Sequence, residues 1–329
     1  MIIDFHTHTF PDKSSEKIVN HLAHIGCIPP HTDGSVIGLF SSMKEADIDY
    51  SVNLPVMTKP SQVEKVNSSL IQQQEYLLDM KIITFGGMHP SYTNYKEELL
   101  RLKQAGIPGI KLHPAYQNVD LDDIRMMRII DEASSQGLIT LVHAGIDIGI
   151  YDHNYSSVAH ILKLLKEVAP EKLVLAHMGN WGCWNEVESD LAGAPVYFDT
   201  AFSYGPVTPL PDAPRAPYIS YNLHPKDFVR LVKKHGTDKI LFGTDSPWEN
   251  QQDYVKRISH MDFTKEELEQ ILSENAKKLL SMCDVLVDGL FIEELKDLRL
   301  KFKGSSNQRT IDLQKSLKNE KVILLDGYN

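Results

Sequence analysis

The chain has only three cysteines, Cys27, Cys183 and Cys283, which are odd in number and far apart. This spacing excludes a disulfide framework and fits a reducing compartment, so we expect the protein in the cytoplasm. No apolar run approaches the roughly 20 residues of a membrane-spanning helix. The first apolar run already begins at Met1, so we expect no secretion signal ahead of it.

Positive charge is also scarce. The 34 Lys and Arg residues are outnumbered by 44 Asp and Glu residues, which gives a formal net charge of -10. In the absence of a Lys/Arg-rich run, this balance excludes nucleic acids and acidic membrane surfaces as expected partners. The 329 residues, of which 42% are hydrophobic, suffice for one large α/β domain with an appendage, or for two ordinary domains.

Short apolar runs alternate with longer segments about eight times. The longer segments have helical periodicity, as at Leu162, Leu165 and Val168. The predicted strands are Ile2–His6, Tyr50–Pro55, Ile82–Met88, Ile107–His113, Leu138–His143, Leu173–His177, Val196–Thr200 and Lys239–Asp245. The predicted helices include Ser61–Met80, Tyr95–Ala105, Asp122–Gln136, Val158–Val168 and Lys226–His235, and glycines suited to a left-handed cap follow three of them at Gly106, Gly137 and Gly236.

Several predicted strands are apolar on both faces, as in Leu138–Val142 and Leu173–Ala176. This pattern is typical of a parallel sheet that helices cover on both sides. Eight strand–helix units in succession predict an α/β chain folded as a (β/α)8 TIM barrel with a C-terminal extension. The alternative is an open, doubly wound sheet, but the glycine-rich phosphate loop of that fold is absent after the first strand.

Two inserted segments depart from the repeat. Gly26–Ile37 is predicted to be a loop before the helix that leads into the second strand. Phe202–Tyr221 carries five prolines and is too long for an ordinary connection. Its aromatic residues give it something to pack, so we expect a lid or a pocket wall.

The third departure is the end of the chain. Phe263–Leu280 is predicted to be the closing helix of a barrel that spans residues 1–282. Residues 283–329 then form an extension, predicted to contain a helix at Leu290–Phe302 and a strand at Lys321–Leu325. This extension could form a homo-oligomer contact or lie against the barrel.

Side chains that can bind a metal collect where the predicted strands end, and active sites of (β/α)8 barrels lie at those ends. His6 and His8 project from one face of the first strand, and Asp4 on the same face could support them from behind. Most remaining histidines, such as His235, fall in helices or loops, where we expect surface or packing roles. The groups at strand ends are His6, His8, His89, Lys111, His113, His143, His177 and Asp245.

These residue types suit a catalytic divalent cation. Imidazole and carboxylate groups bind Zn²⁺ or a similar ion, and a catalytic site keeps one position for water. The ion lowers the pKa of that water to about 7 and polarises a substrate carbonyl. A nearby carboxylate can accept the proton and pass it to the leaving group. Asp245 is placed for both ligation and this proton transfer.

The motifs that contain these residues resemble the amidohydrolase superfamily. More narrowly, they are similar to its amidohydrolase-related branch of metal-dependent barrels, which also contains decarboxylases. The resemblance extends from Met1 to about Leu280. It rests on an ordered set of five segments, DFHTH, GIKLHP, LVHAG, LAHMGN and FGTDSPW.

The resemblance implies a role for each matching residue. His6 and His8 would bind the first metal, and Asp245 would be a ligand of that metal and the general base. His143 would bind a metal. His177 would either bind a second metal or, in a one-metal site, orient and polarise the attacked group.

Lys111 decides between one ion and two. Some relatives carry a carbamylated lysine at the end of strand four that bridges two metals, and KLHPA is similar to the dihydroorotase version of that motif. Burial among metal-bound cations favours the neutral amine that carbamylation needs. Other relatives hold a single metal, which is the interpretation we favour from the sequence, with Lys111 or His113 contacting the substrate. Arg215, which could bind a carboxylate through two hydrogen bonds, and Trp248 are further expected substrate contacts.

Three functions are compatible with these observations. The first is a metal-dependent hydrolase, with Zn²⁺ as the expected ion, that cleaves a C–N or C–O bond of a small, anionic substrate. The second is a nonoxidative decarboxylase of an aromatic or dienoic acid that uses the same ligands. The third is a catalytically vestigial metal-binding barrel that acts as an interaction protein.

Overall fold

A computed structural model of the chain describes residues 1–211 and 223–281. In the extension it describes residues 285–288, 295, 306, 309–312 and 323–324. Arg215, expected to contact the substrate, therefore lies outside the described residues.

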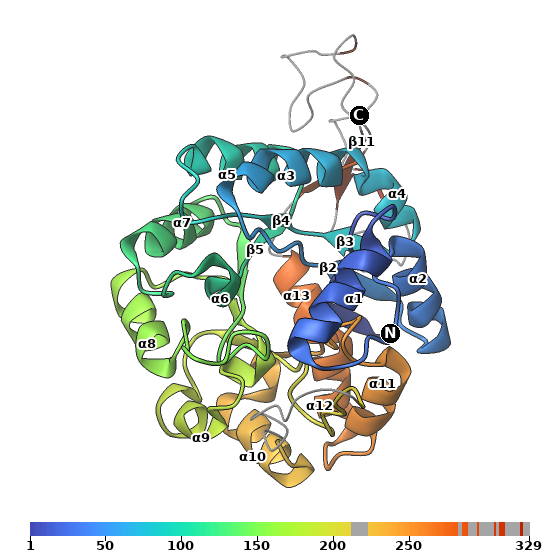
Figure 1. Cartoon of the computed structure of the whole chain (residues 1–329), viewed down its shortest axis with the longest axis vertical. Helices are drawn as coiled ribbons and strands as arrows, with labels where there is room; N and C mark the ends of the chain where they lie inside the picture. The colour runs from blue at the N-terminus through green and yellow to red at the C-terminus, as the bar shows by residue number, and fades with distance from the viewer. Residues whose placement is uncertain are drawn as a thin grey trace.

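The described strands of residues 1–281 form the staves of a barrel (Figure 1). The predicted strand Ile82–Met88 is divided at Phe85 into two short strands, so eight staves are built from nine segments. The segments are β1 Ile3–Thr7, β2 Tyr50–Asn53, β3 Ile82–Thr84, β4 Gly86–Gly87, β5 Gly109–Leu112, β6 Ile139–Val142, β7 Leu173–Leu175, β8 Tyr197–Asp199 and β9 Ile240–Leu241.

The strands run parallel and neighbour one another in chain order, as β1-β2-β3 and β4-β5-β6-β7-β8-β9. A hydrogen bond from Phe85 N to Asn53 O (3.0 Å) connects the two sheets. The cylinder closes between the last strand and the first, where Phe5 N donates to Phe242 O (2.7 Å) and Asp245 N donates to His6 O (2.8 Å). The predicted (β/α)8 barrel is confirmed.

Helices surround the barrel, and each predicted helical segment coincides with observed helices to within two residues at its ends (Figure 1). The segment predicted as one helix at Ser61–Met80 is divided at Gln73 into two helices. Gly106 and Gly137 have positive φ angles of 77° and 74° directly after two of these helices, as left-handed caps require. The α-helices are α1 Ser15–Gly26, α2 Val36–Glu45, α3 Val63–Gln72, α4 Gln74–Asp79, α5 Tyr95–Gln104, α6 Pro114–Gln117, α7 Ile124–Ser135, α8 Val158–Glu167, α9 Trp184–Glu186, α10 Pro225–His235, α11 Gln251–Ser259, α12 Lys265–Glu269 and α13 Asn275–Ser281.

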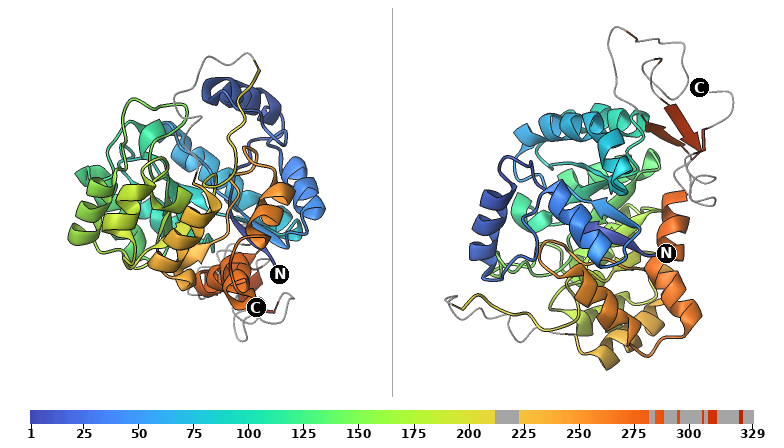
Figure 2. Two further views of the ribbon diagram at one scale, coloured as in Figure 1. Left: turned by 90° about the horizontal axis from the view of Figure 1, so that it is seen from below. Right: turned by 90° about the vertical axis from the view of Figure 1, so that its right-hand side faces the viewer.

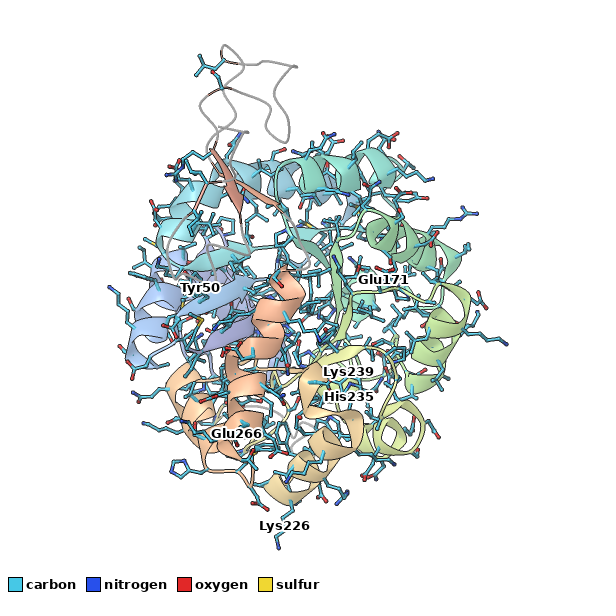
Figure 3. The ribbon with its side chains drawn as sticks, turned by 180° about the vertical axis from the view of Figure 1, so that it is seen from behind. Tyr50, Glu171, Lys226, His235, Lys239 and Glu266 are labelled. Carbon is cyan, nitrogen blue, oxygen red and sulfur yellow. The ribbon has the colours of Figure 1, made fainter. Side chains whose placement is uncertain are left out.

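Two apolar layers hold the barrel together. The larger layer lies between strands and helices and includes Leu102 of α5, Ile161 of α8 and Phe228 of α10. The second layer fills the barrel, where Phe5 and Phe85 meet edge to face with ring centroids 5.9 Å apart. Leu279 and Leu280 of α13 belong to this inner layer. Seen from behind, α13 lies across the barrel, so it closes the end opposite the site (Figure 3).

Two of the inserted segments meet at the other end of the barrel. Leu210, in the long connection after β8, donates a backbone hydrogen bond to Cys27 O (2.8 Å) just after α1. Figure 2 shows this connection and α1 at the end opposite α13. The structure describes the predicted lid only as far as residue 211.

The extension contains an antiparallel strand pair that the sequence did not predict, β10 Val285–Asp288 and β11 Arg309–Asp312. The guanidinium Nη2 of Arg309 lies 3.8 Å from Oε1 of Glu75 in α4. The predicted helix Leu290–Phe302 lies outside the described residues apart from Leu295, and the predicted strand Lys321–Leu325 lies outside them apart from Ile323 and Leu324. None of the described helices is both long and apolar enough to cross a membrane.

His235 at the end of α10 is a packing residue, as expected. Its Nδ1 accepts the N–H of Gly193 (3.1 Å) and its Nε2 donates to Val196 O (2.9 Å). Its ring stacks on Phe198 with a centroid distance of 3.7 Å. Burial lowers the pKa of His235 to about 4, because this environment satisfies only the neutral ring.

We expect the free energy of unfolding to fall as the pH drops from about 6.5 to about 4. In that window the unfolded chain takes up a proton at His235 that the folded chain excludes, and this linkage is worth up to about 3 kcal/mol. Urea unfolding at pH 7 and pH 4.5 measures the loss. His235→Gln cannot be protonated in this range, so its loss should be smaller, and equal losses in both proteins would contradict the assignment.

Candidate functional site

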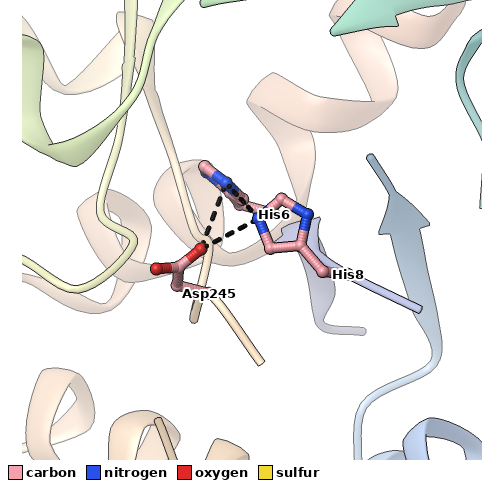
Figure 4. A group of neighbouring side chains, drawn as sticks. All are labelled: His6, His8 and Asp245. Carbon is pink, nitrogen blue, oxygen red and sulfur yellow. Dashed lines mark hydrogen bonds and ion pairs between the residues drawn. The ribbon is translucent and has the colours of Figure 1, made fainter. Parts of the chain in front are cut away.

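His6, His8 and Asp245 converge on one point at the carboxyl end of the barrel (Figure 4). The Nε2 atoms of His6 and His8 are 3.2 Å apart. Asp245 Oδ1 lies 3.1 Å from His8 Nε2 and 3.3 Å from His6 Nε2. The three atoms therefore form a nearly equilateral triangle, although Asp245 is 237 residues from His8 in the chain.

The protons of both imidazoles lie on the outer nitrogens. His8 Nδ1 is 2.7 Å from Leu54 O, which can only accept a hydrogen bond. His6 Nδ1 is 2.8 Å from Asp199 Oδ2, and the other oxygen of Asp199 accepts the N–H groups of His177 and Ala201. With the proton on Nδ1, the Nε2 atom of each neutral ring is an electron-pair donor. The two Nε2 atoms and a carboxylate oxygen consequently face one another.

This triangle fits a cation. Ligand atoms held at about 2.0–2.1 Å around a tetrahedral Zn²⁺ lie about 3.3–3.4 Å apart, close to the separations observed. Burial lowers the pKa of His6 well below its usual value, so the ring is a neutral ligand at physiological pH. The acceptor behind each imidazole is the outer partner that metal-binding histidines require.

A second pair of imidazoles, those of His143 and His177, also lies close together at this end of the barrel. His177 Nδ1 donates to Ala201 O (2.9 Å), and its Nε2 lies 3.0 Å from His143 Nδ1. A proton on His143 Nδ1 would leave His143 Nε2 as a bare lone pair, buried without a hydrogen-bond partner and 3.9 Å from Asp147 Oδ2. If the proton of His143 is on Nε2 instead, it faces the carboxylate of Asp147. The lone pairs of His143 Nδ1 and His177 Nε2 then face each other, as those of His6 and His8 do. This second arrangement also fits a cation.

Lys111 lies beside the triangle. Its Nζ is 3.3 Å from His6 Nε2, and the side chain is fully buried. Burial lowers the pKa of Lys111 to about 8, because the charged amine loses its hydration, while the carboxylates of Asp199 and Asp245 oppose the shift. The neutral amine of Lys111 is therefore more accessible than that of a solvent-exposed lysine.

Two of these groups have unusual backbone conformations. Asp245 has a φ of 70° and His177 a φ of 59°, both in the left-handed region that non-glycine residues rarely occupy. Such conformations cost roughly 1–3 kcal/mol each and persist where the surrounding structure holds them. In Asp245 the strand-closing hydrogen bond to His6 O holds it.

The role expected of Asp4 was wrong. Its carboxylate binds Thr244 Oγ1 (2.6 Å) and Gln251 Nε2 (2.7 Å) and makes no contact with the imidazole rings. The register of β1 against β2 shifts between Asp4 and Thr7, so simple alternation does not extend across this strand. Asp199 supports His6 instead. Asp199 was not predicted from the sequence, although it ends β8 on the same side of the barrel as the other site residues.

His113 and Trp248, the two expected substrate contacts that the structure describes, both lie near the site. His113 is buried and stacks on His143 with ring centroids 4.1 Å apart. Trp248 is half-buried against the core, and its backbone N–H donates to Asp245 O (2.9 Å). Both lie near the site, and their contact with substrate stays a prediction. Asp147, which the sequence analysis also missed, is buried and lies 3.6 Å from His113.

The sequence matches the family described as Amidohydrolase over residues 3–282. A search of curated protein sequences gives no match.

Solved structures share the fold. An uncharacterized TIM-barrel protein from Bordetella bronchiseptica has 17% identity and a TM-score of 0.66, covering 86% of this chain and 99% of its own. A dihydroxybenzoic acid decarboxylase from Polaromonas sp. JS666, with bound manganese and an inhibitor, has 13% identity and a TM-score of 0.61, covering 85% and 97%. A probable 2-pyrone-4,6-dicarboxylic acid hydrolase from Acinetobacter baumannii has 19% identity and a TM-score of 0.57, covering 85% and 98%.

Asp199→Asn should weaken cation binding at the triangle by about 10- to 100-fold. The amide oxygen must face the two N–H groups, so the amide nitrogen would donate to His6 Nδ1 and move the ring proton to Nε2. Titration with Zn²⁺ against a competing chelator measures the loss. Asp253→Asn, at an exposed carboxylate on α11, is the matched control. Unchanged affinity in Asp199→Asn would refute the proton assignment.

Proposed function

The chain belongs to the amidohydrolase family, and from that premise we propose that it is a metal-dependent hydrolase. It would use an activated water on a C–N or C–O bond of a small, anionic substrate. The observation that carries this proposal is the triangle of unprotonated ligand atoms at His6, His8 and Asp245, 3.1–3.3 Å apart. Buried acceptors that face one another are costly unless a cation lies between them.

We assign two cations to the site. His6, His8 and Asp245 would hold the first, and His143 Nδ1 with His177 Nε2 would hold the second. With a single ion, which the sequence favoured, His143 Nδ1 would instead donate to His177 Nε2 (3.0 Å), and His143 Nε2 would be left as a buried acceptor without a hydrogen-bond partner. Nitrogen and carboxylate ligands suit Zn²⁺, although availability also decides which ion is bound. When bound, such ions lower the pKa of water and polarise a carbonyl.

Lys111, as a carbamate, would supply a further ligand to each of the two cations. Its neutral amine attacks CO₂, an N–C bond forms, and the nitrogen releases one proton to solvent. The product is an anionic carboxylate at the end of the lysine side chain, which compensates the buried positive charge of two cations. The burial of Lys111 and its 3.3 Å distance from His6 Nε2 support this role.

Asp245 would be the general base. It accepts a proton from the attacking water and passes it to the leaving group, so one carboxylate serves both halves of the reaction. Its side chain and that of His8 are slightly exposed, at 12% and 11%, whereas that of His6 is 1% exposed. Substrate would therefore approach from the side of His8 and Asp245, past Trp248.

The remaining expectations stay proposals. A small substrate, rather than nucleic acid or membrane, suits a buried site in an acidic chain, and a cationic centre suits an anionic group. Arg215 and His113 are proposed to contact that group. The extension after residue 282 is proposed as a homo-oligomer contact, and the three separated cysteines support a cytoplasmic location.

Metal content tests the two-cation site. We expect two Zn²⁺ per chain in protein loaded in the presence of bicarbonate, together with an added carboxyl group on Lys111. Elemental analysis and mass spectrometry of the native protein measure these. Exhaustive chelation should abolish hydrolysis across a panel of cyclic amides, lactones and esters, and Zn²⁺ should restore it. Full activity after chelation would overturn the proposal.

Asp245→Asn should reduce kcat by about 10²- to 10⁴-fold while the melting temperature changes little, because the base and one ligand charge are lost. Asp253→Asn again serves as the control. The assay follows both water uptake and CO₂. Release of CO₂ without net hydrolysis would assign the site to decarboxylation, and no turnover of any substrate by metal-replete protein would favour a vestigial site.

A further inference from the structure

One imidazole of the site has no acceptor on its outer nitrogen. His6 has Asp199, His8 has Leu54 O and His177 has Ala201 O, at 2.7–2.9 Å. The outer nitrogen of His143 is Nε2, which is buried and has no hydrogen-bond partner. The nearest acceptor is Asp147 Oδ2, at 3.9 Å. A movement of about 1 Å would bring the two atoms within hydrogen-bond distance.

The chain holds Asp147 in place for that contact. Asp147 Oδ1 accepts the N–H of Gly149 (2.7 Å), which leaves Oδ2 free to face His143. The turn between the two residues depends on Gly145, which has a φ of 107°. A Cβ on Gly145 would lie 2.1 Å from Trp181 N, so only glycine lets the chain return over His143.

The ring of His113 faces the same oxygen, Asp147 Oδ2. Its ring stacks on that of His143 with an interplanar angle of 13°, and its Nε2 lies 3.6 Å from Asp147 Oδ2. His113 Nδ1 accepts the N–H of Tyr116 (3.3 Å), so the proton of the neutral ring is on Nε2. Two stacked imidazoles thus present their outer edges to one carboxylate oxygen.

We propose that Asp147 is a positioning residue that accepts the Nε2 proton of His143 and keeps His143 Nδ1 unprotonated for the second cation. This inference rests on the proposed function, because it needs a cation between His143 and His177. Asp147 serves His143 as Asp199 serves His6. His113 holds the shared oxygen from the other side and fixes its direction.

A cation among His113, His143 and Asp147 is the competing arrangement, because their ligand-type atoms lie within 4.8 Å of one another. His113 opposes it. With Nδ1 accepting from the backbone, His113 Nε2 is a donor and cannot be a ligand. The group therefore has one carboxylate acceptor and two N–H donors. They would satisfy one another without an ion once the 3.6 Å and 3.9 Å separations close to hydrogen-bond distance.

The experiment uses the full chain, stripped of metal and equilibrated with a series of buffered free Zn²⁺ concentrations. Bound zinc per chain is measured at each concentration. The wild type should take up two ions. Asp147→Asn should weaken one of the two binding steps by about 10- to 100-fold. The amide oxygen must accept from Gly149, so the amide nitrogen donates to His143 Nε2 and moves the proton to Nδ1.

Asp147→Ala distinguishes this role from simple packing. Alanine leaves His143 Nε2 free to donate to water, so the loss of zinc affinity should be smaller than in Asp147→Asn. If Asp147 only filled space, asparagine would behave like the wild type and alanine would be worse. Asp120→Ala removes a half-exposed carboxylate that pairs with His153 at 2.7 Å, and it should leave both steps unchanged. Melting temperatures show that the variants are folded.

The outcomes separate the two proposals. Two zinc ions in the wild type and in Asp147→Asn, with equal affinities, would overturn the role of Asp147 and leave the two-cation site intact. A wild type that binds one ion or none would overturn both. Loss of a third ion in the Asp147 variants would place a cation among His113, His143 and Asp147 and would also overturn this inference. Asp199→Asn should weaken the other step, and an effect on the same step would contradict the assignment.

Discussion

The position of one proton on each buried imidazole determines what the site can bind. Acceptors behind His6 and His8 draw those protons outward, so their Nε2 atoms face each other at a separation of 3.2 Å. Neutral rings of this kind are ligands for a cation and poor partners for one another. Because a preformed set of lone pairs is costly without an ion, cation binding and the stability of the folded chain are coupled.

The barrel makes this arrangement possible by bringing the carboxyl ends of its strands to one rim. The closure between the last strand and the first is especially direct, since Asp245 N donates to His6 O (2.8 Å). The same hydrogen bond that completes the cylinder brings the carboxylate of Asp245 next to the imidazole of His6, two of the proposed ligands. It also holds Asp245 in a left-handed backbone conformation, so the geometry of the fold and that of the site are set by one contact.

Much of this could be predicted from the sequence, for identifiable reasons. Buried parallel strands are continuous apolar runs, and a polar side chain at the end of such a run stands out, as His143 and His177 do. The outer acceptors could not be predicted in the same way. Asp199 lies 193 residues from His6, and any neighbouring strand could have supplied that oxygen. Alternation pointed to Asp4 instead, because it takes no account of the register shift in β1.

The helix at the closed end of the barrel, α13, is the last helix of the barrel, and its Leu279 and Leu280 belong to the same buried apolar cluster as Phe5 of the first strand. During synthesis, the interior of the cylinder is therefore incomplete until nearly 280 residues have left the ribosome. The histidines of β1 emerge long before Asp245. With the proposed ligand set, the choice of ion would consequently be made after translation, from the pool of free metal that the newly finished chain meets as it folds.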